Sequence, residues 1–456
     1  MLESPLSLNL TDRPILRLIT LCILYVAQGI PYGFVTVTFA SYLAERGETV
    51  AAIASVTALS TLPWTFKFVW GPFMDRFGIP SMGRRRPWII AAQLGMTLTI
   101  LAMAFVDNPA EHLVLIGWLV FVHNIFNSLQ DVSVDALAVD LLRESERGRA
   151  NGFMYGSKYI GMFLGGAFLS RMVSEDGLGV AFTIQIMMLG GIMLFPLFLR
   201  ERAGEKLLPW TKGKSQLQAD EQLARSVSQL FGFLRRAFTL RSTLLAGVVG
   251  LTIFIASGIL SPITNVLFIQ DLGWTRTDFT DISGGYGVII GLGGAIAGGF
   301  LADRFGPKRI ATIGCIVLAL SYATFGLSSP ETGIIPWFDW TNRPAVIGYI
   351  LLDTLMSSMI SASLFAMYMT VSWPKVAATQ FTAYMAILNL STVVGLKLSG
   401  MLEATFSLPV IFVGAGILQL AVIVVFPFID VHQARRTLGH EAGSSGDNSK
   451  SNYQSH

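Results

Sequence analysis

Four ionisable residues in the first half of the chain lie deep within otherwise apolar stretches. Asp131 and Asp135 stand four residues apart in one stretch, and Lys67 and Lys158 lie in two others. A spacing of four places both carboxylates on one face of an α-helix, where their repulsion favours uptake of a proton by one of them. A charge at the centre of a membrane helix costs about 2.5–3.5 kcal/mol, so each of these residues calls for an explanation.

The four residues also lie at similar depth. At ~1.5 Å per residue from the nearest end of its apolar stretch, Asp131 is ~17 Å deep, Asp135 ~10 Å, Lys158 ~14 Å and Lys67 ~12 Å. We predict a titratable Asp/Lys network, in which protonation of Asp131 or Asp135 frees a lysine to bind an anionic solute. The alternative is a permanently paired ion bridge that only fixes the packing of helices.

Polar uncharged residues accompany these charges. Each can hydrogen-bond a sugar or peptide group of a solute, or join two neighbouring helices. The candidates for the same pathway are Gln28, Asn127, Gln130, Tyr155 and Asn389.

Catalytic and cofactor sites are not predicted. The chain has no His-Glu-x-x-His, Gly-x-Ser-x-Gly or Gly-x-x-x-x-Gly-Lys-Ser/Thr motif. Its two cysteines, Cys22 and Cys315, lie in separate apolar stretches, so neither a metal site nor a disulfide framework is indicated. We therefore expect no enzymatic activity, no metal and no cofactor.

The composition is that of a membrane protein. Only 13% of the 456 residues are charged and 52% are apolar, whereas a soluble domain carries roughly 25% charged residues. This excludes an ordinary soluble enzyme and a disordered scaffold. The net charge of +3 is too small to indicate a nucleic-acid partner.

Long apolar runs predict an all-α polytopic membrane protein with twelve transmembrane helices. About 20 residues suffice to cross ~30 Å of hydrocarbon. The first run is too long for a cleavable signal peptide. The predicted spans are 15–42, 49–74, 87–107, 112–142, 149–173, 178–199, 242–269, 280–302, 308–328, 344–372, 376–403 and 407–429.

The basic residues predict the orientation of these helices. With both termini in the cytoplasm, 25 of the 32 Lys and Arg residues fall in cytoplasmic segments. Four lie on the other side, and Lys67, Lys158 and Lys397 remain inside the spans. The positive-inside rule therefore favours cytoplasmic termini.

The chain also contains a tandem duplication. Residues 71–78, Gly-Pro-Phe-Met-Asp-Arg-Phe-Gly, match residues 299–306, Gly-Phe-Leu-Ala-Asp-Arg-Phe-Gly, at an offset of 228. Ala150 and Phe153 meet Ala378 and Phe381 at the same offset. We predict two six-helix halves, 1–199 and 242–430, joined by a linker, 200–241, and followed by a disordered cytoplasmic tail, 431–456.

The linker carries its own helical pattern. Its apolar residues from Leu223 to Phe238 follow helical spacing, with polar residues opposite. We predict an amphipathic helix at the inner membrane surface that tethers the halves.

The repeated Asp-Arg pairs are candidate gating residues. Asp75 and Arg76 in the first half correspond to Asp303 and Arg304 in the second. An aspartate here can accept hydrogen bonds from a helix N-terminus across the boundary between the halves, which would hold the cytoplasmic side shut. Asp140, near basic residues at the same side, is a further latch or capping residue.

A second gate is suggested near the outer surface. Asp353 lies ~13 Å and Lys397 ~9 Å from the outer ends of their helices. The two can pair as an outer gate or form a structural bridge.

Residues 299–309, Gly-Phe-Leu-Ala-Asp-Arg-Phe-Gly-Pro-Lys-Arg, resemble the cytoplasmic loop signature of the major facilitator superfamily. Three further runs, 27–33, 62–72 and 128–140, resemble the branch that holds the AmpG-type muropeptide permeases, the acetyl-coenzyme A transporters and certain siderophore permeases. The most specific part is Gln130-Asp131-x-x-x-Asp135 within a membrane helix.

The resemblance implies a carrier that works by alternating access and is driven by protons. Its leading implied activity is import of a muropeptide-like solute across a bacterial inner membrane by a monomer. A siderophore or a coenzyme A ester is the alternative solute, and a receptor without transport is the alternative outside this class. The implied partners are a small solute, protons and the lipid bilayer.

Overall fold

The computed structural model describes residues 9–77, 79–213, 227–335, 339–373 and 376–439. These residues are helical apart from loops and one isolated bridge between Asn9 and Arg200. The α-helices are α1 (Pro14–Gly33), α2 (Ala40–Glu45), α3 (Val50–Thr61), α4 (Trp70–Arg76), α5 (Arg86–Ala104), α6 (Leu113–Leu141), α7 (Glu144–Phe163), α8 (Leu169–Asp176), α9 (Leu178–Phe198), α10 (Val227–Phe238), α11 (Arg241–Thr252), α12 (Ile255–Val266), α13 (Arg276–Thr280), α14 (Gly287–Phe305), α15 (Pro307–Leu327), α16 (Arg343–Val371), α17 (Ala377–Glu403), α18 (Leu408–Ile423) and α19 (Gln433–Gly439).

Several of these helices continue into one another through short 3-10 or π-helical turns. Ten of the resulting segments are long and apolar enough to cross a membrane: 14–45, 86–104, 113–141, 178–198, 241–271, 276–305, 307–327, 343–371, 379–403 and 408–438. Two further predicted spans correspond to the continuous helical runs 50–76 and 144–176, which carry more polar residues. The all-α membrane fold is thus confirmed, whereas the count of twelve spans stays a prediction.

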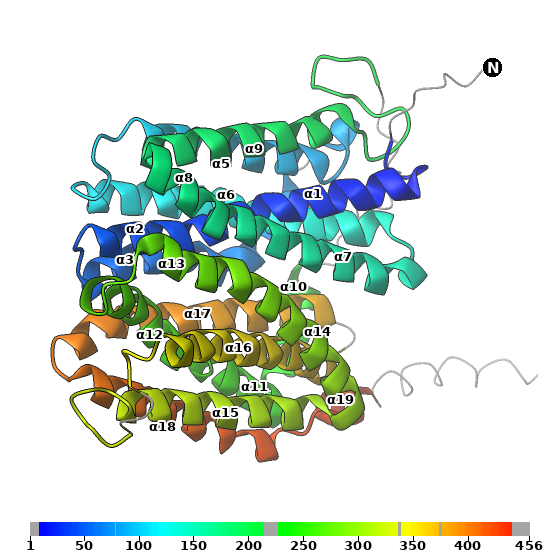
Figure 1. Cartoon of the computed structure of the whole chain (residues 1–456). Coiled ribbons are helices and arrows are strands. Elements are labelled where there is room, and N and C mark those ends of the chain that lie inside the picture. The colour runs from blue at the N-terminus through cyan, green and yellow to red at the C-terminus, as the bar shows by residue number, and fades with distance from the viewer. Residues whose placement is uncertain (1–8, 78, 214–226, 336–338, 374–375, 440–456) are drawn as a thin grey trace, which may run out of the picture.

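The helices form two groups that face each other. Figure 1 shows α1 to α3 and α5 to α9 in one part of the bundle and α11, α12 and α14 to α18 in the other, with α13 at the boundary between them. Within the first group α1 packs on α7, and α5 packs on α6 and α9. Within the second, α14 packs on α16 and α15 on α18, while α17 reaches across to α3.

Glycines bring α1 and α7 into backbone contact. A Cβ atom at Gly29 would lie 2.2 Å from the carbonyl oxygen of Lys158, and one at Gly161 would lie 2.2 Å from that of Val26. Only a residue without a side chain fits at such distances. This contact fixes Lys158 close to α1.

The start of the linker is bound to the first group. The Glu201 carboxylate accepts hydrogen bonds from the backbone N–H groups of Arg84, Arg85 and Arg86 at 2.9, 2.7 and 2.5 Å. These groups lie at the N-terminus of α5, where N–H donors lack helical partners. Residues 199–201 are thereby tied to the helices of the first group.

The predicted amphipathic helix corresponds to α10, although residues 223–226 lie outside the described part of the chain. Phe233 of α10 stacks edge-on against Trp373, with ring centres 5.5 Å apart. The same apolar cluster includes Ala434 and Leu438. The linker is therefore anchored to the first group at its start and to the second group through α10.

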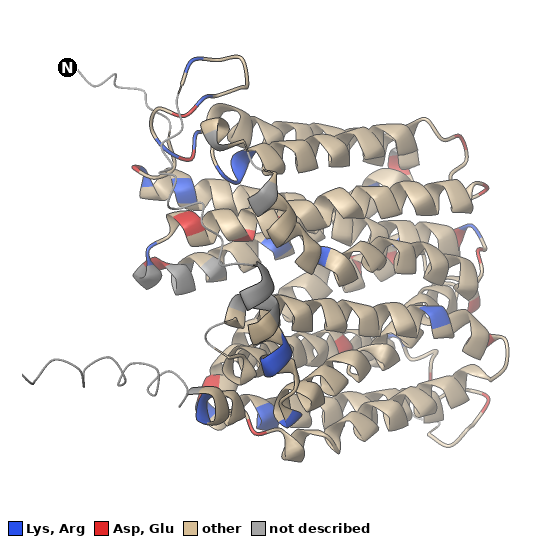
Figure 2. Ribbon diagram, turned by 180° about the vertical axis from the view of Figure 1, so that it is seen from behind, with Lys and Arg blue, Asp and Glu red and all other residues tan. Residues whose placement is uncertain are grey.

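Figure 2 shows Lys and Arg gathered at one end of the bundle, beside the N-terminus. We call this the basic end; it comprises the loops around 76–86, 141–149, 199–213 and 304–309. The loops around 45–50, 271–276 and 403–408 form the opposite end.

Charged residues join the two groups at the opposite end. The buried Arg276 guanidinium pairs with Glu45 at 2.7 Å and donates to the carbonyl oxygen of Ser170 at 2.8 Å. Arg171 pairs with Asp281 at 2.6 Å. These five residues are called the Arg276 cluster, and they hold the two halves together at this end.

Candidate substrate pathway

A buried ion pair joins the segment 50–76 to α6. Lys67 Nζ lies 3.1 Å from Asp131 Oδ2, and the side chains are only 10% and 8% exposed. Lys67 belongs to the 3-10 stretch Leu62–Val69, which lies in the middle of this segment and carries Pro63 in its first turn. Because an isolated charge is poorly tolerated at such a site, each residue depends on the other.

Asp135 has a different environment one turn further along α6. Its carboxylate accepts a hydrogen bond from the Tyr25 hydroxyl, and its side chain is exposed. The Tyr25 ring lies 6.0 Å from that of Tyr155, which is also exposed. The two predicted carboxylates therefore differ: Asp131 is buried against a cation, whereas Asp135 is bound by a hydroxyl group and is accessible.

Trp64 lies near both lysines. Its ring centre is 5.5 Å from Lys158 Nζ and 5.9 Å from Lys67 Nζ. Such distances allow cation–π attraction, worth about 0.5–2 kcal/mol. Lys158 makes no ion pair with any described residue, so the aromatic face is its stabilising neighbour.

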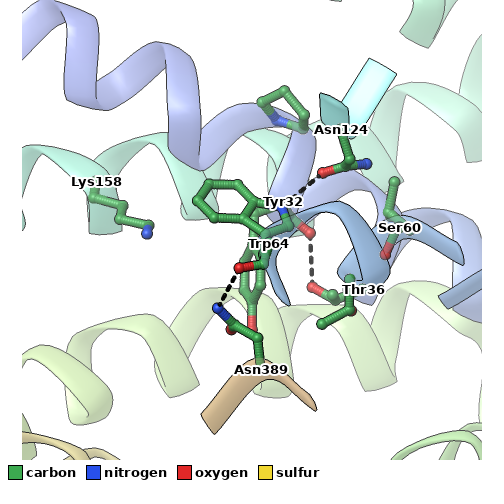
Figure 3. Close-up of a pocket in the computed structure, with 10 residues that line it drawn as sticks. Tyr32, Thr36, Ser60, Trp64, Asn124, Lys158 and Asn389 are labelled. Carbon is green, nitrogen blue, oxygen red and sulfur yellow. Dashed lines mark hydrogen bonds between the residues drawn. The ribbon is translucent and has the colours of Figure 1, made fainter. Parts of the chain in front are cut away.

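A pocket of about 430 Å³ opens beside these residues, lined by side chains from both halves. Figure 3 shows Lys158 directed toward Trp64, with Asn389 below the tryptophan. Trp64 Nε1 donates to Asn124 Oδ1 at 3.1 Å, and Asn389 Nδ2 approaches the Trp64 carbonyl oxygen at 3.5 Å. A small set of polar groups around an aromatic ring is typical of a solute site.

The predicted polar residues fall into two sets. Tyr155 is exposed and Asn389 lines the pocket. Gln28, Asn127 and Gln130 are completely buried between helices. Gln130 Nε2 donates to the carbonyl oxygen of Leu24 at 2.9 Å. These three amides thus lie away from the pocket wall.

Among the described side chains, the predicted latch residues Asp140, Asp303 and Arg304 make no ion pair across the boundary between the halves. Asp303 and Arg304 are exposed at the basic end, and Arg304 lies over the Phe305 ring. Asp140 pairs with Arg85 at 3.0 Å within the first half.

Asp75 and Arg76 close α4, but their side chains lie outside what the structure describes. Asp353 and Lys397 do not pair with each other in this structure: Asp353 accepts a hydrogen bond from the Tyr322 hydroxyl at 2.7 Å, and Lys397 is exposed.

Sequence reasoning missed Trp64, Tyr25 and the Arg276 cluster. Trp64 precedes Lys67 by three residues, and this spacing on a helix could have revealed the shared face. Tyr25 and Arg276 contact Asp135 and Glu45, which are distant from them in the sequence, and no local pattern reveals such contacts.

The family model of the Major Facilitator Superfamily matches residues 21–396 and 246–451. The chain is 25% identical over 316 residues to "Putative transporter AmpG 4" of Rickettsia conorii, covering 68% of this chain and 73% of that protein. It is 23% identical over 420 residues to "Putative transporter AmpG 3" of Rickettsia typhi, covering 90% and 95%. It is 24% identical over 367 residues to the "Anhydromuropeptide permease" of Escherichia coli, covering 80% and 70%.

Solved structures agree on the fold. A crystal structure of a D-xylose-proton symporter matches with a TM-score of 0.69 at 12% identity, covering 92% of this chain and 99% of that one. A POT family transporter in complex with a thioalcohol-conjugated peptide matches with a TM-score of 0.65 at 12% identity, covering 90% and 95%. The family match spans more than half of the chain, and the chain therefore belongs to the Major Facilitator Superfamily and is a membrane transporter that resembles the AmpG permeases.

Proposed function

We propose that this chain is a proton-coupled carrier that imports a muropeptide-like solute, an amino sugar joined to a peptide, across a bacterial inner membrane. The relatives named as AmpG transporters and as an anhydromuropeptide permease support this solute class. The excess of basic residues at one end supports cytoplasmic termini. Residues of both halves line the pocket, so a monomer is able to supply the whole proposed pathway.

Alternating access gives the two ends different roles. In this proposal the basic end faces the cytoplasm, and the Arg276 cluster closes the outer side. The Asp-Arg pairs at Asp75 and Asp303, with Asp140, then close the cytoplasmic side in the other state. Asp303 and Arg304 are exposed and Asp140 pairs with Arg85 in its own half, which supports an arrangement open toward the cytoplasm.

The observation that carries the coupling mechanism is the buried Lys67–Asp131 pair beside the pocket. In the proposed cycle a proton reaches the accessible Asp135 and passes to Asp131. Neutral Asp131 no longer holds Lys67, whose ammonium group joins Lys158 near Trp64. Two cations then attract the anionic part of the solute, and loss of the proton to the cytoplasm restores the pair and releases the solute.

Uptake by the purified protein in proteoliposomes tests the proposal. Labelled anhydromuropeptide, a ferric siderophore and a coenzyme A ester are compared with and without an inwardly directed proton gradient. We expect the anhydromuropeptide alone to accumulate, and only with the gradient. Accumulation of another solute would overturn the substrate assignment, and binding without accumulation would indicate a receptor.

A further inference from the structure

A second pocket, of about 690 Å³, lies in the C-terminal half. Its walls come from α12, α16 and neighbouring segments, and they combine hydroxyl groups with aromatic rings. Ser257, Ser261 and Thr264 supply hydroxyls from one side, and Tyr322 and Tyr349 supply rings 6.4 Å apart. Such a lining suits a polar solute with sugar-like or cationic character.

Asp353 provides the charge in this pocket. Its Oδ1 accepts the hydrogen bond from Tyr322 at 2.7 Å. Its Oδ2 accepts no hydrogen bond from a described residue. It is also not one of the fully buried atoms that lack a partner, so it is accessible from the pocket. Within the described residues no Lys or Arg forms an ion pair with it. The carboxylate thus offers one free oxygen to a donor that enters the pocket.

The two pockets meet at Thr36, which lines both. One pocket carries the Lys158 ammonium from the N-terminal half, and the other carries the Asp353 carboxylate from the C-terminal half. Neither charge has a counter-ion among the described residues. One extended ligand can therefore satisfy both charges and touch both halves.

We infer that the transported solute is zwitterionic, with an anionic group at Lys158 and a protonated amine at Asp353. This rests on the proposed function and narrows its substrate class to muropeptides that carry a free amine. The Tyr322 and Tyr349 rings add cation–π attraction to the ammonium group, and the hydroxyls of α12 accept its remaining hydrogen bonds. Contact with both halves also explains how the solute couples to their relative movement.

Paired solutes test this inference. Uptake is measured for an anhydromuropeptide with a free peptide amine and for the same compound with that amine acetylated. The wild-type protein should show a KM about 10- to 100-fold lower for the free amine, the range expected for a charge-assisted hydrogen bond. Asp353→Asn should raise the KM of the free-amine solute by the same factor and that of the acetylated solute much less. Glu403→Gln, at an exposed carboxylate of α17, is the matched control and should change neither.

Each other outcome has a distinct meaning. Equal KM values for the two solutes in the wild type would overturn the inference and leave the proposed function standing. An equal loss of uptake for both solutes in Asp353→Asn would also overturn it and would assign Asp353 a structural or proton-carrying role. Absence of accumulation of either solute by the wild-type protein would refute the proposed function itself.

Discussion

Removing one partner at a time from the Lys67–Asp131 pair has a predictable effect on stability. At 3.1 Å and an effective dielectric constant of about 20, the Coulomb attraction is ~5 kcal/mol. Asp131→Asn leaves a buried ammonium group without a counter-ion, and loss of one partner of such a pair destabilises by about 3–5 kcal/mol. The double variant Lys67→Met/Asp131→Asn removes both charges and should return to within ~1 kcal/mol of the wild type.

Denaturant unfolding in mixed micelles measures these free energies for the wild type, both single variants and the double variant. The difference between the double variant and the sum of the singles gives the coupling energy. Proteoliposome uptake is then measured on the double variant. We expect restored stability with no response to a pH gradient, because the titratable acceptor is gone. Restored stability with normal gradient-driven uptake would contradict this reasoning and identify the pair as a structural bridge.

Three further predictions concern other parts of the molecule. Gly161→Ala places a methyl group 2.2 Å from a backbone oxygen of α1 and should destabilise the protein by about 1–3 kcal/mol, whereas Gly156→Ala, with no neighbour within 4 Å, should leave the thermal unfolding midpoint unchanged. Arg276→Gln breaks the ion pair with Glu45 at the opposite end. In a protein that also carries Ser170→Cys, this change should make the buried cysteine react faster with a thiol reagent than Ser170→Cys alone. An unchanged rate would show that the Arg276 cluster does not close this end. Burial raises the pKa of the Glu205 carboxyl from 4.5 to about 7, so protonation favours the folded loop and its stability falls as pH rises from 4.5 through 7. Hydrogen exchange of residues 199–213 should show this loss relative to Glu205→Gln, and identical pH profiles would disprove it.

The sequence was informative about single helices. The four-residue spacing placed Asp131 and Asp135 on one face of α6, and the apolar runs located segments such as 377–403 within one residue. Both follow from helical periodicity and from the absence of water in the hydrocarbon core, which act locally.

The sequence was much less informative about contacts between helices. Trp64 and Lys67 share the 3-10 stretch Leu62–Val69, but Lys158, which lies over the Trp64 ring, comes from α7 and could not be inferred from their spacing. Similarly, Asp353 was expected to pair with Lys397, but its carboxylate instead accepts a hydrogen bond from Tyr322 on α15. Which helix faces another depends on the packing of the whole bundle and not on any local pattern.

Proton movement driven by the solute tests the central proposal most directly. Anhydromuropeptide is added to proteoliposomes in weakly buffered medium, and the external pH is recorded alongside solute uptake. We predict external alkalinisation with the wild-type protein and its loss in Asp131→Asn and Asp135→Asn, with the Glu403→Gln control unaffected. Uptake without any pH change, or unchanged alkalinisation in both aspartate variants, would contradict it.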